Sequence, residues 1–184
     1  MDILELYKSA GAYLEGHFLL VSGKHSEFFL QSTTVTQHPK YCDAIGEAIA
    51  ESLPKDLGAQ FVLGPAMGGV TLAFAVARAL NVRALFAEKD GRGGMFVRDA
   101  FTIEPGERFL AVEDVVTTGG SLMKAVRGAE ARGASCVGLA SIVDRGKFKL
   151  AEGLPYVTLL ELDFPAYDPD TCPLCQAGIT LEKV

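Results

Sequence analysis

The sequence predicts an α/β fold with a central parallel sheet flanked by helices. Short apolar runs recur along the chain, and segments with apolar or small residues at helical spacing follow them. Strands that alternate with helices are joined by right-handed crossovers, which make the strands parallel. Of the 184 residues, 49% are hydrophobic and 22% are charged, as in soluble globular proteins. We therefore expect one domain over residues 1–184.

The core of this domain is expected over residues 58–145. Gly58 and Gly133 are expected to lie just past the ends of helices, where glycine readily adopts the positive φ of a terminating residue. Two helices are predicted at 69–80 and 120–132. Four buried strands are predicted at 60–63, 82–87, 108–113 and 135–143.

Three segments lie outside this regular pattern. Residues 2–37 combine a short amphipathic helix pattern with alternating residues, and they predict a small hood over one end of the sheet. Residues 88–94, Glu-Lys-Asp-Gly-Arg-Gly-Gly, predict a flexible loop at the tip of a hairpin continued by 95–100. The tail, residues 165–184, has the weakest pattern.

Composition excludes several classes of function. The net charge is -6 and no segment concentrates Lys and Arg, which disfavours nucleic-acid binding. No apolar run approaches the roughly 20 residues that cross a bilayer, and the first residues are acidic, unlike a signal peptide. We expect a cytoplasmic protein without membrane contact.

The four cysteines do not predict a disulfide framework. Cys42 and Cys136 stand alone in apolar segments and are expected to behave as small buried hydrophobes. Cys172 and Cys175 form one Cys-x-x-Cys pair, which is half of a zinc site. Since no second Cys or His pair is near it in the sequence, packing of the tail is favoured over metal binding.

The segment with the clearest chemistry runs over residues 109–121. An apolar strand ends in Glu113 and Asp114, and the chain then turns through Thr, Gly and Ser into a helix. Glycines, successive amides and a helix N-terminus can hold a phosphate, while two carboxylates can accept hydrogen bonds from ribose hydroxyls. A bare Gly-Gly-Ser turn would be read as a capped helix with acids in solvent. The full string instead predicts a site for a phosphorylated sugar.

This string resembles the phosphoribosyl diphosphate signature of the type I phosphoribosyltransferases. Three further segments, in the right order, resemble the orotate phosphoribosyltransferases: Ser-Gly-Lys-His-Ser-Glu-Phe-Phe at 22–29, Gly-Pro-Ala at 64–66 and Val-Asp-Arg at 143–145. The resemblance implies that family's fold, with a hood and a flexible loop. It also implies phosphoribosyl transfer to orotate in pyrimidine synthesis, with Mg²⁺ held mainly by substrate, and a homodimer in which loop 88–94 is shared across the interface.

Site residues follow from the same resemblance. Arg145 is expected to bind the orotate carboxylate as a bidentate partner, although without the resemblance a surface arginine is equally plausible. Lys89 and Asp114 are expected to be catalytic. The orotate site would add Lys24, Phe29 and Thr117; the phosphoribosyl diphosphate site would comprise Lys89, Arg92, Glu113, Asp114, Val115, Val116, Thr117, Thr118, Gly119, Gly120 and Ser121.

The chain also departs from the family pattern. Val21 and Gly68 stand where many members have lysines that contact diphosphate, and loop 88–94 has no histidine. Lys24, Lys89, Arg92 and Arg98 are candidates to replace the missing cations. His25 is either an acid or a packing residue. A transferase for another base and a regulator that senses phosphoribosyl diphosphate stay open as alternatives, the regulator disfavoured because no basic face is evident.

Overall fold

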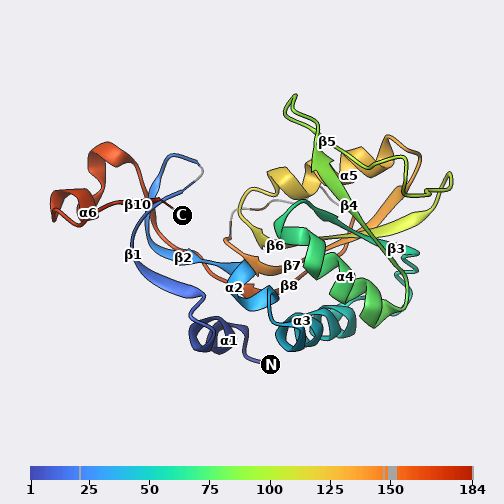
Figure 1. The fold of residues 1–184 in the computed structure, drawn as a ribbon, viewed down its shortest axis with the longest axis horizontal. Coiled ribbons are helices and arrows are strands. Elements are labelled where there is room, and N and C mark those ends of the chain that lie inside the picture. The colour runs from blue at the N-terminus through green and yellow to red at the C-terminus, as the bar shows by residue number, and fades with distance from the viewer. Residues whose placement is uncertain (21, 147, 149–152, 184) are drawn as a thin grey trace.

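The computed structural model describes residues 1–20, 22–146, 148 and 153–183, and these form two sheets (Figure 1). The larger sheet has the order β5-β4-β3-β6-β7-β8 and the smaller one β10-β1-β2-β9. The larger sheet consists of β3 (Phe61–Pro65), β4 (Arg83–Lys89), β5 (Met95–Phe96), β6 (Arg108–Val116), β7 (Ser135–Asp144) and β8 (Tyr156–Glu161). The smaller sheet consists of β1 (Tyr13–Leu19), β2 (His25–Leu30), β9 (Ala166–Tyr167) and β10 (Glu182–Lys183).

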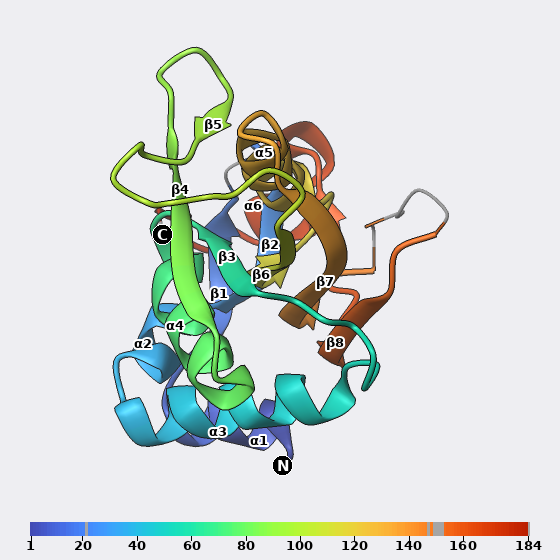
Figure 2. The ribbon, with the colours of Figure 1, turned by 90° about the vertical axis from the view of Figure 1, so that its right-hand side faces the viewer.

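Helices cover both faces of the larger sheet (Figure 2). Along β3, Val62 packs into the hydrophobic cluster of α3 and α4, while Phe61 and Leu63 pack into the cluster of α5. Alternate residues of a strand point to opposite faces, so a strand covered on both faces is apolar throughout. The helices are α1 (Ile3–Ser9), α2 (Ser32–Thr36), α3 (Pro39–Ser52), α4 (Gly68–Leu80), α5 (Gly120–Glu130) and α6 (Pro173–Gln176), with a 3₁₀ turn, η1 (Pro169–Thr171).

The predicted α/β core is confirmed. Strands β4, β3, β6, β7 and β8 are parallel, and β5 pairs antiparallel with β4. All four predicted strands are present, with β6 continuing to Val116, so the two acids lie inside the strand. None of the helices within the described residues is long and apolar enough to cross a membrane.

The prediction that Gly58 terminates a helix is wrong, whereas the one for Gly133 is confirmed. Helix α3 ends earlier, at Ser52, because Leu53 is extended before Pro54. Gly58 instead takes a positive φ of 63° in the loop before β3. Gly133, with φ 87°, follows α5 and donates its N–H to the Glu130 carbonyl at 2.8 Å.

The hood combines the two ends of the described chain. As predicted, residues 2–37 begin with a short helix, α1; the alternating residues form a β-hairpin, β1-β2, which α2 follows. The tail adds the remaining strands, since β9 pairs with β2 and β10 pairs with β1. The expectation that the Cys172–Cys175 pair has no partner pair nearby is wrong in space, because the hairpin brings His17 and His25 beside it.

The charged loop lies at the tip of the predicted hairpin, which projects beyond the core (Figure 1). Asp90 closes the loop by accepting hydrogen bonds from the backbone N–H groups of Arg92 (2.7 Å) and Gly94 (2.9 Å). Below the tip, the Arg98 guanidinium pairs with the Glu88 carboxylate through two nitrogens. Local hydrogen bonds and exposed charges therefore shape the tip of the hairpin, whereas Val97 anchors its base in the hydrophobic core.

Candidate active site

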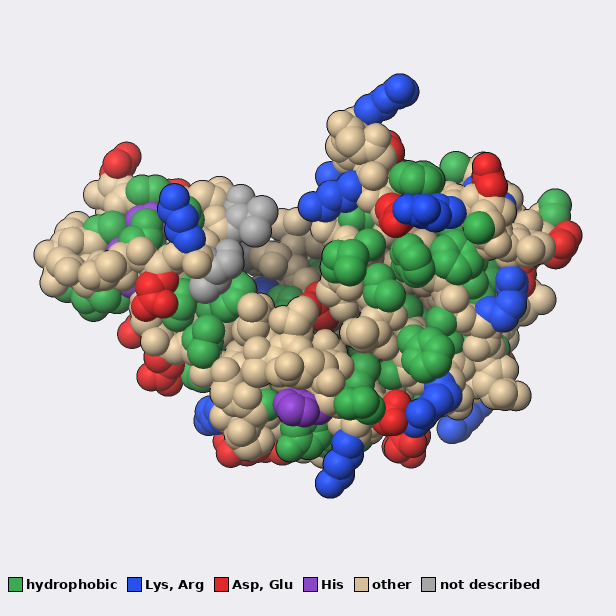
Figure 3. All heavy atoms as spheres, in the orientation of Figure 1, with side chains coloured by type: hydrophobic (Ala, Val, Ile, Leu, Met, Phe, Trp, Pro, Cys, Tyr) green, Lys and Arg blue, Asp and Glu red, His purple; other side chains and the backbone are tan. Residues whose placement is uncertain are grey.

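A cleft of about 770 Å³ opens at the carboxyl ends of β6 and β7, between the core and the hood. Figure 3 shows this hollow between the hood on the left and the core on the right. In open α/β sheets, ligands bind at the carboxyl ends of the strands. Of the predicted site residues, the cleft is lined by Lys24, Phe29, Arg145 and the continuous run 113–121.

The turn between β6 and α5 is shaped to hold an anion. Gly119 has φ 73° and precedes the first residue of α5. A Cβ on Gly119 would lie 2.1 Å from the Phe148 ring, so both backbone angle and space require glycine. The free amides and positive end of the eleven-residue helix α5 face this turn. The turn can therefore bind a phosphate group through its backbone.

The two acids beside this turn differ in exposure, Glu113 being buried and Asp114 half-buried. Glu113 is 8% exposed, and burial together with the neighbouring Asp114 raises the pKa of Glu113 to about 9. Burial also raises the pKa of Asp114, although hydrogen bonds from the Val115 N–H (2.9 Å) and the Ser32 hydroxyl oppose the shift. Asp114 accepts more hydrogen bonds than Glu113, and these bonds favour its charged form. We therefore infer that Glu113 is the protonated member of the pair.

Gly68 lies directly against this pair. A Cβ on Gly68 would meet the Asp114 carboxylate oxygens at 2.9 and 3.0 Å, closer than such contacts normally come. The family pattern described above has a lysine at this position. In this chain a lysine would push Asp114 aside unless the backbone shifted. Gly68 leaves space beside Asp114 where many members of that family carry a cation. Val21, the other departure, lies outside the described residues.

Arg145 reaches the cleft from the end of β7. Its guanidinium stacks on the Phe164 ring at 4.8 Å, and its Nε is buried without a hydrogen-bond partner among the described residues. Burial lowers the pKa of the guanidinium, against the opposing charge of Asp163. An unpaired donor on a fixed, planar cation can bind a planar carboxylate.

The hood closes the cleft with one of its two adjacent phenylalanines. Phe29 lines the cleft, whereas Phe28 packs against Tyr13 and Phe164, at ring distances of 5.6 and 4.9 Å. Phe29, the predicted member of the pair, therefore lies at the cleft, and Phe28 packs against the core. Lys24 also lines the cleft, and its Nζ pairs with Asp168 of the tail at 3.0 Å.

Two predicted site residues, Lys89 and Arg92, and the open candidate His25 do not line this cleft. Lys89, at the end of β4, is exposed and does not line it. Arg92 lines a separate hollow of about 670 Å³ between the hairpin and α5. His25 is buried beside His17 and is also absent from the lining. Within one chain, Asp114 is therefore not brought together with Lys89 or Arg92.

The prediction missed Ser32 and Lys124. Ser32 follows β2 and hydrogen-bonds to the Tyr7 hydroxyl at 2.9 Å as well as to Asp114. No local pattern signals it, because its partner is far away in the sequence. Lys124 lines the cleft from α5 and stands three residues after Ser121, on the same side of the helix. This spacing of three residues on a helix could have predicted that Lys124 lies on the same side as Ser121.

Comparison with known proteins extends over the whole chain. Residues 31–165 match the family of the phosphoribosyl transferase domain. An orotate phosphoribosyltransferase of Thermus thermophilus is 59% identical over 184 residues, covering 100% of both chains. Among solved structures, that of orotate phosphoribosyltransferase from Aeropyrum pernix aligns with a TM-score of 0.73 at 27% identity, covering 88% of this chain and 94% of that one. The Mycobacterium tuberculosis enzyme, solved with 5-phospho-alpha-D-ribosyl 1-diphosphate, gives 0.69 at 28% identity and covers 88% and 97%.

Proposed function

The chain belongs to the orotate phosphoribosyltransferase family, and we propose that the cleft between core and hood is its active site. The reaction transfers the phosphoribosyl group from 5-phosphoribosyl 1-diphosphate to N1 of orotate, and it yields orotidine 5-phosphate and diphosphate for pyrimidine synthesis. Orotate is already an anionic nucleophile, so no strong base is required. The protein must stabilise positive charge on the ribose and negative charge on the diphosphate.

The turn between β6 and α5, residues 117–121, here called the phosphate turn, binds the 5-phosphate of the sugar. The run 117–121 offers backbone amides, hydroxyl donors and the N-terminus of α5, all at one wall of the cleft. Lys124 adds a cation one helical turn further along the same wall. The observation that carries this role is Gly119, whose positive φ and lack of space for a Cβ fix the turn.

Glu113 and Asp114 bind the ribose hydroxyls. Burial, together with the charge of the half-buried Asp114, raises the pKa of Glu113, so this pair of carboxyl groups favours partners that donate hydrogen bonds or carry positive charge. The same hard oxygen donors fit Mg²⁺, which we assign mainly to the diphosphate and ribose oxygens, close to these carboxyls. When bound, the ion would neutralise charge on the departing diphosphate.

Arg145 and Phe29 select the base. The orotate carboxylate would satisfy the unpaired Nε side of the Arg145 guanidinium, and Phe29 would cover the planar ring from the hood. Lys24 and Thr117 line the same cleft. This combination of one fixed cation and one aromatic face fits a planar anion better than a neutral purine.

The loop cations act in the partner's cleft of a homodimer. Lys89 and Arg92 are exposed and do not line the cleft of their own chain, which supports a role across an interface. Met67 and Phe74, beside and within α4, are 83% and 63% exposed, and hydrophobic side chains gather on this face in Figure 3. An apolar face of this kind fits association of two copies.

The assay is loss of orotate absorbance in the ultraviolet. We expect turnover only when both phosphoribosyl diphosphate and magnesium are present. Adenine and hypoxanthine serve as controls, because turnover of either, with none of orotate, would support the transferase for another base. Binding of phosphoribosyl diphosphate without turnover of any base would support the regulator.

The shared loop is tested by subunit mixing. Lys89→Ala and Asp114→Asn should each be nearly inactive, whereas a mixture that has exchanged subunits should regain part of the activity. The reason is that one hybrid cleft receives both intact groups. No recovery, despite exchange confirmed by mass spectrometry of differently tagged subunits, would place both groups in one chain's cleft.

A further inference from the structure

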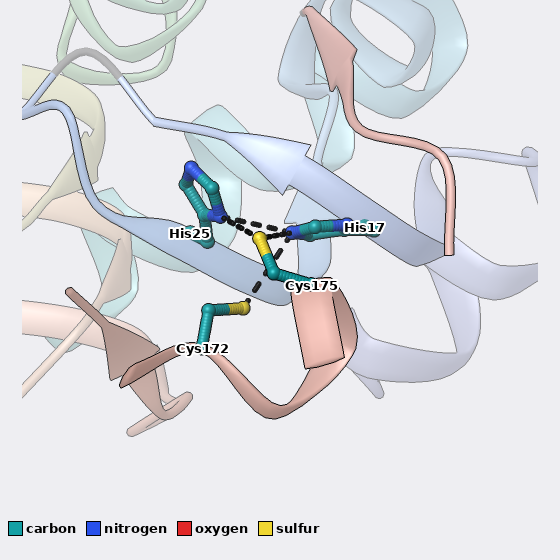
Figure 4. A group of neighbouring side chains, drawn as sticks. All are labelled: His17, His25, Cys172 and Cys175. Carbon is teal, nitrogen blue, oxygen red and sulfur yellow. Dashed lines mark hydrogen bonds between the residues drawn. The ribbon is translucent and has the colours of Figure 1, made fainter. Parts of the chain in front are cut away.

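Four potential metal ligands converge in the hood, outside the proposed active site. His17 comes from β1, His25 from β2, Cys172 from the turn before α6 and Cys175 from α6 (Figure 4). One ligand atom from each lies within 4.8 Å of the other three. His17, His25 and Cys172 are buried, and Cys175 closes the group on its exposed side.

The spacing of these atoms is close to that of a tetrahedral zinc site. Zn–N bonds of about 2.0–2.1 Å and Zn–S bonds of about 2.3 Å give tetrahedral edges of about 3.3 Å between nitrogens and about 3.6 Å between nitrogen and sulfur. Here His17 Nε2 and His25 Nδ1 are 2.9 Å apart. The sulfur–nitrogen distances are 3.5 Å for Cys172 and 3.7 and 3.3 Å for Cys175. Small side-chain rotations would bring these distances to those of the tetrahedral site.

Hydrogen bonding alone does not account for this packing. His17 Nδ1 lies 2.8 Å from the Ile179 carbonyl, which can only accept, so this nitrogen carries the hydrogen. The neutral ring then has one lone pair, on Nε2, yet His25 Nδ1 and both sulfurs converge on that atom. One lone pair accepts well from one donor. A cation at the centre would instead use a lone pair from each of the four groups.

We propose that His17, His25, Cys172 and Cys175 bind one structural Zn²⁺ ion. Two imidazoles and two thiolates in a tetrahedral arrangement match the donors that zinc prefers. Four protein ligands leave no open position for substrate, which makes the site structural. The contact between His17 and the Ile179 carbonyl has the form of the outer hydrogen bond that orients a metal-bound histidine.

The tail has little else to hold it. Among the described residues 168–183, Cys172 is the one buried residue, and Leu174 is half-buried. Its other attachments include the short pairing of β10 with β1, the hydrogen bond from His17 to the Ile179 carbonyl and the exposed ion pair between Asp168 and Lys24. A segment without a hydrophobic core commonly depends on a metal or a disulfide. Zinc would join the tail to the hairpin.

This joint lies next to the proposed orotate site. His25 directly follows Lys24, which lines the cleft and pairs with Asp168 of the tail. The ion would therefore hold the β1-β2 turn and the tail in one position relative to the cleft. This consequence rests on the proposed function, whereas the metal site itself does not.

The test uses the full chain without an affinity tag, since a histidine tag binds metals. Cells are grown with added zinc, and metals are measured by mass spectrometry after dialysis. We expect one zinc ion per chain in the wild type and in Cys136→Ser, which makes the same change at a thiol in β7, away from the tail. Cys175→Ser should lose most of the zinc. Because Cys175 is exposed, this change leaves no cavity in the core.

Two further measurements do not depend on activity. Replacement of zinc by Co²⁺ should give the intense visible bands of a tetrahedral thiolate site in the wild type and in Cys136→Ser, but not in Cys175→Ser. Removal of zinc from the wild type by a chelator should expose residues 168–183 to rapid proteolysis while the core stays resistant.

Three results would overturn the proposal. One is a metal-free wild type whose tail resists proteolysis. Another is a disulfide between Cys172 and Cys175 in the freshly purified protein, and the third is iron in place of zinc. If the zinc results hold and orotate is not consumed, the failure belongs to the proposed function and not to the metal site.

Discussion

Replacing Glu113 by Gln should stabilise the ligand-free protein at neutral and alkaline pH. The pKa of Glu113 is raised from 4.5 to about 9 by burial and by Asp114. The folded state therefore holds a proton that the unfolded chain releases above pH 4.5, so this residue's contribution to stability falls as pH rises from 4.5 to about 9. At 1.36 kcal/mol for each pH unit, the cost at pH 8 has an upper limit of about 5 kcal/mol.

Part of the shift comes from repulsion by Asp114, which can be relieved if Asp114 is protonated in place of Glu113. We therefore expect Glu113→Gln to raise the free energy of unfolding by roughly 2 kcal/mol at pH 8 and by almost nothing at pH 4.5. For a chain of this size the gain corresponds to a rise in melting temperature of about 4–8 °C. The measurement is urea unfolding at several pH values without substrate, with Glu51→Gln, an exposed glutamate on α3, as the control. Equal destabilisation of Glu113→Gln at every pH would show that Glu113 is ionised in the fold, and the reasoning would fail.

Three other substitutions separate the parts of the cleft. Arg145→Gln should raise the orotate KM by about 10- to 100-fold, the value of a lost charge-assisted hydrogen bond, while the melting temperature falls only slightly, because the Nε has no partner to lose among the described residues and only the stacking on Phe164 is removed. Gly68→Ala should weaken binding of phosphoribosyl diphosphate in titration calorimetry by displacing the Asp114 carboxylate; unchanged binding would show that the turn yields. Lys89→Ala should lower kcat by about 100-fold or more while stability changes by less than about 0.5 kcal/mol, and a large drop in melting temperature would instead assign it a structural role.

The core and the phosphate turn could be predicted because their signals are local. A buried parallel strand is apolar throughout, and 109–121 carries strand, acids, glycines and helix start in one continuous run. The acids and the turn act on one ligand from adjacent positions in the sequence. The prediction therefore placed Glu113, Asp114 and the turn together, as the structure does.

The missed elements have signals that depend on the rest of the fold. Strand β8 lies at the edge of the sheet, and its residues are mostly half-buried, so its pattern is weaker than that of the central strands. Gly58 was predicted to terminate the helix before β3, but α3 ends earlier, at the extended residue before Pro54. A proline can stop a helix as effectively as a glycine, and here it acts first.

The four-residue cluster in the hood shows why the partners of the Cys172–Cys175 pair could not be predicted from the sequence. In a zinc finger that folds from one short segment the ligands lie close together in the sequence, but no second Cys or His pair is near Cys172 and Cys175 in this sequence. In this chain β10 pairs with β1, which brings residues 155 positions apart to 3.5 Å. His17 and His25 face each other because the hairpin places them on neighbouring strands, although eight positions separate them. A Cys-x-x-Cys pair in a tail with no core should therefore be compared with every histidine of a distant hairpin, since a metal that joins two ends of a chain draws half its ligands from each.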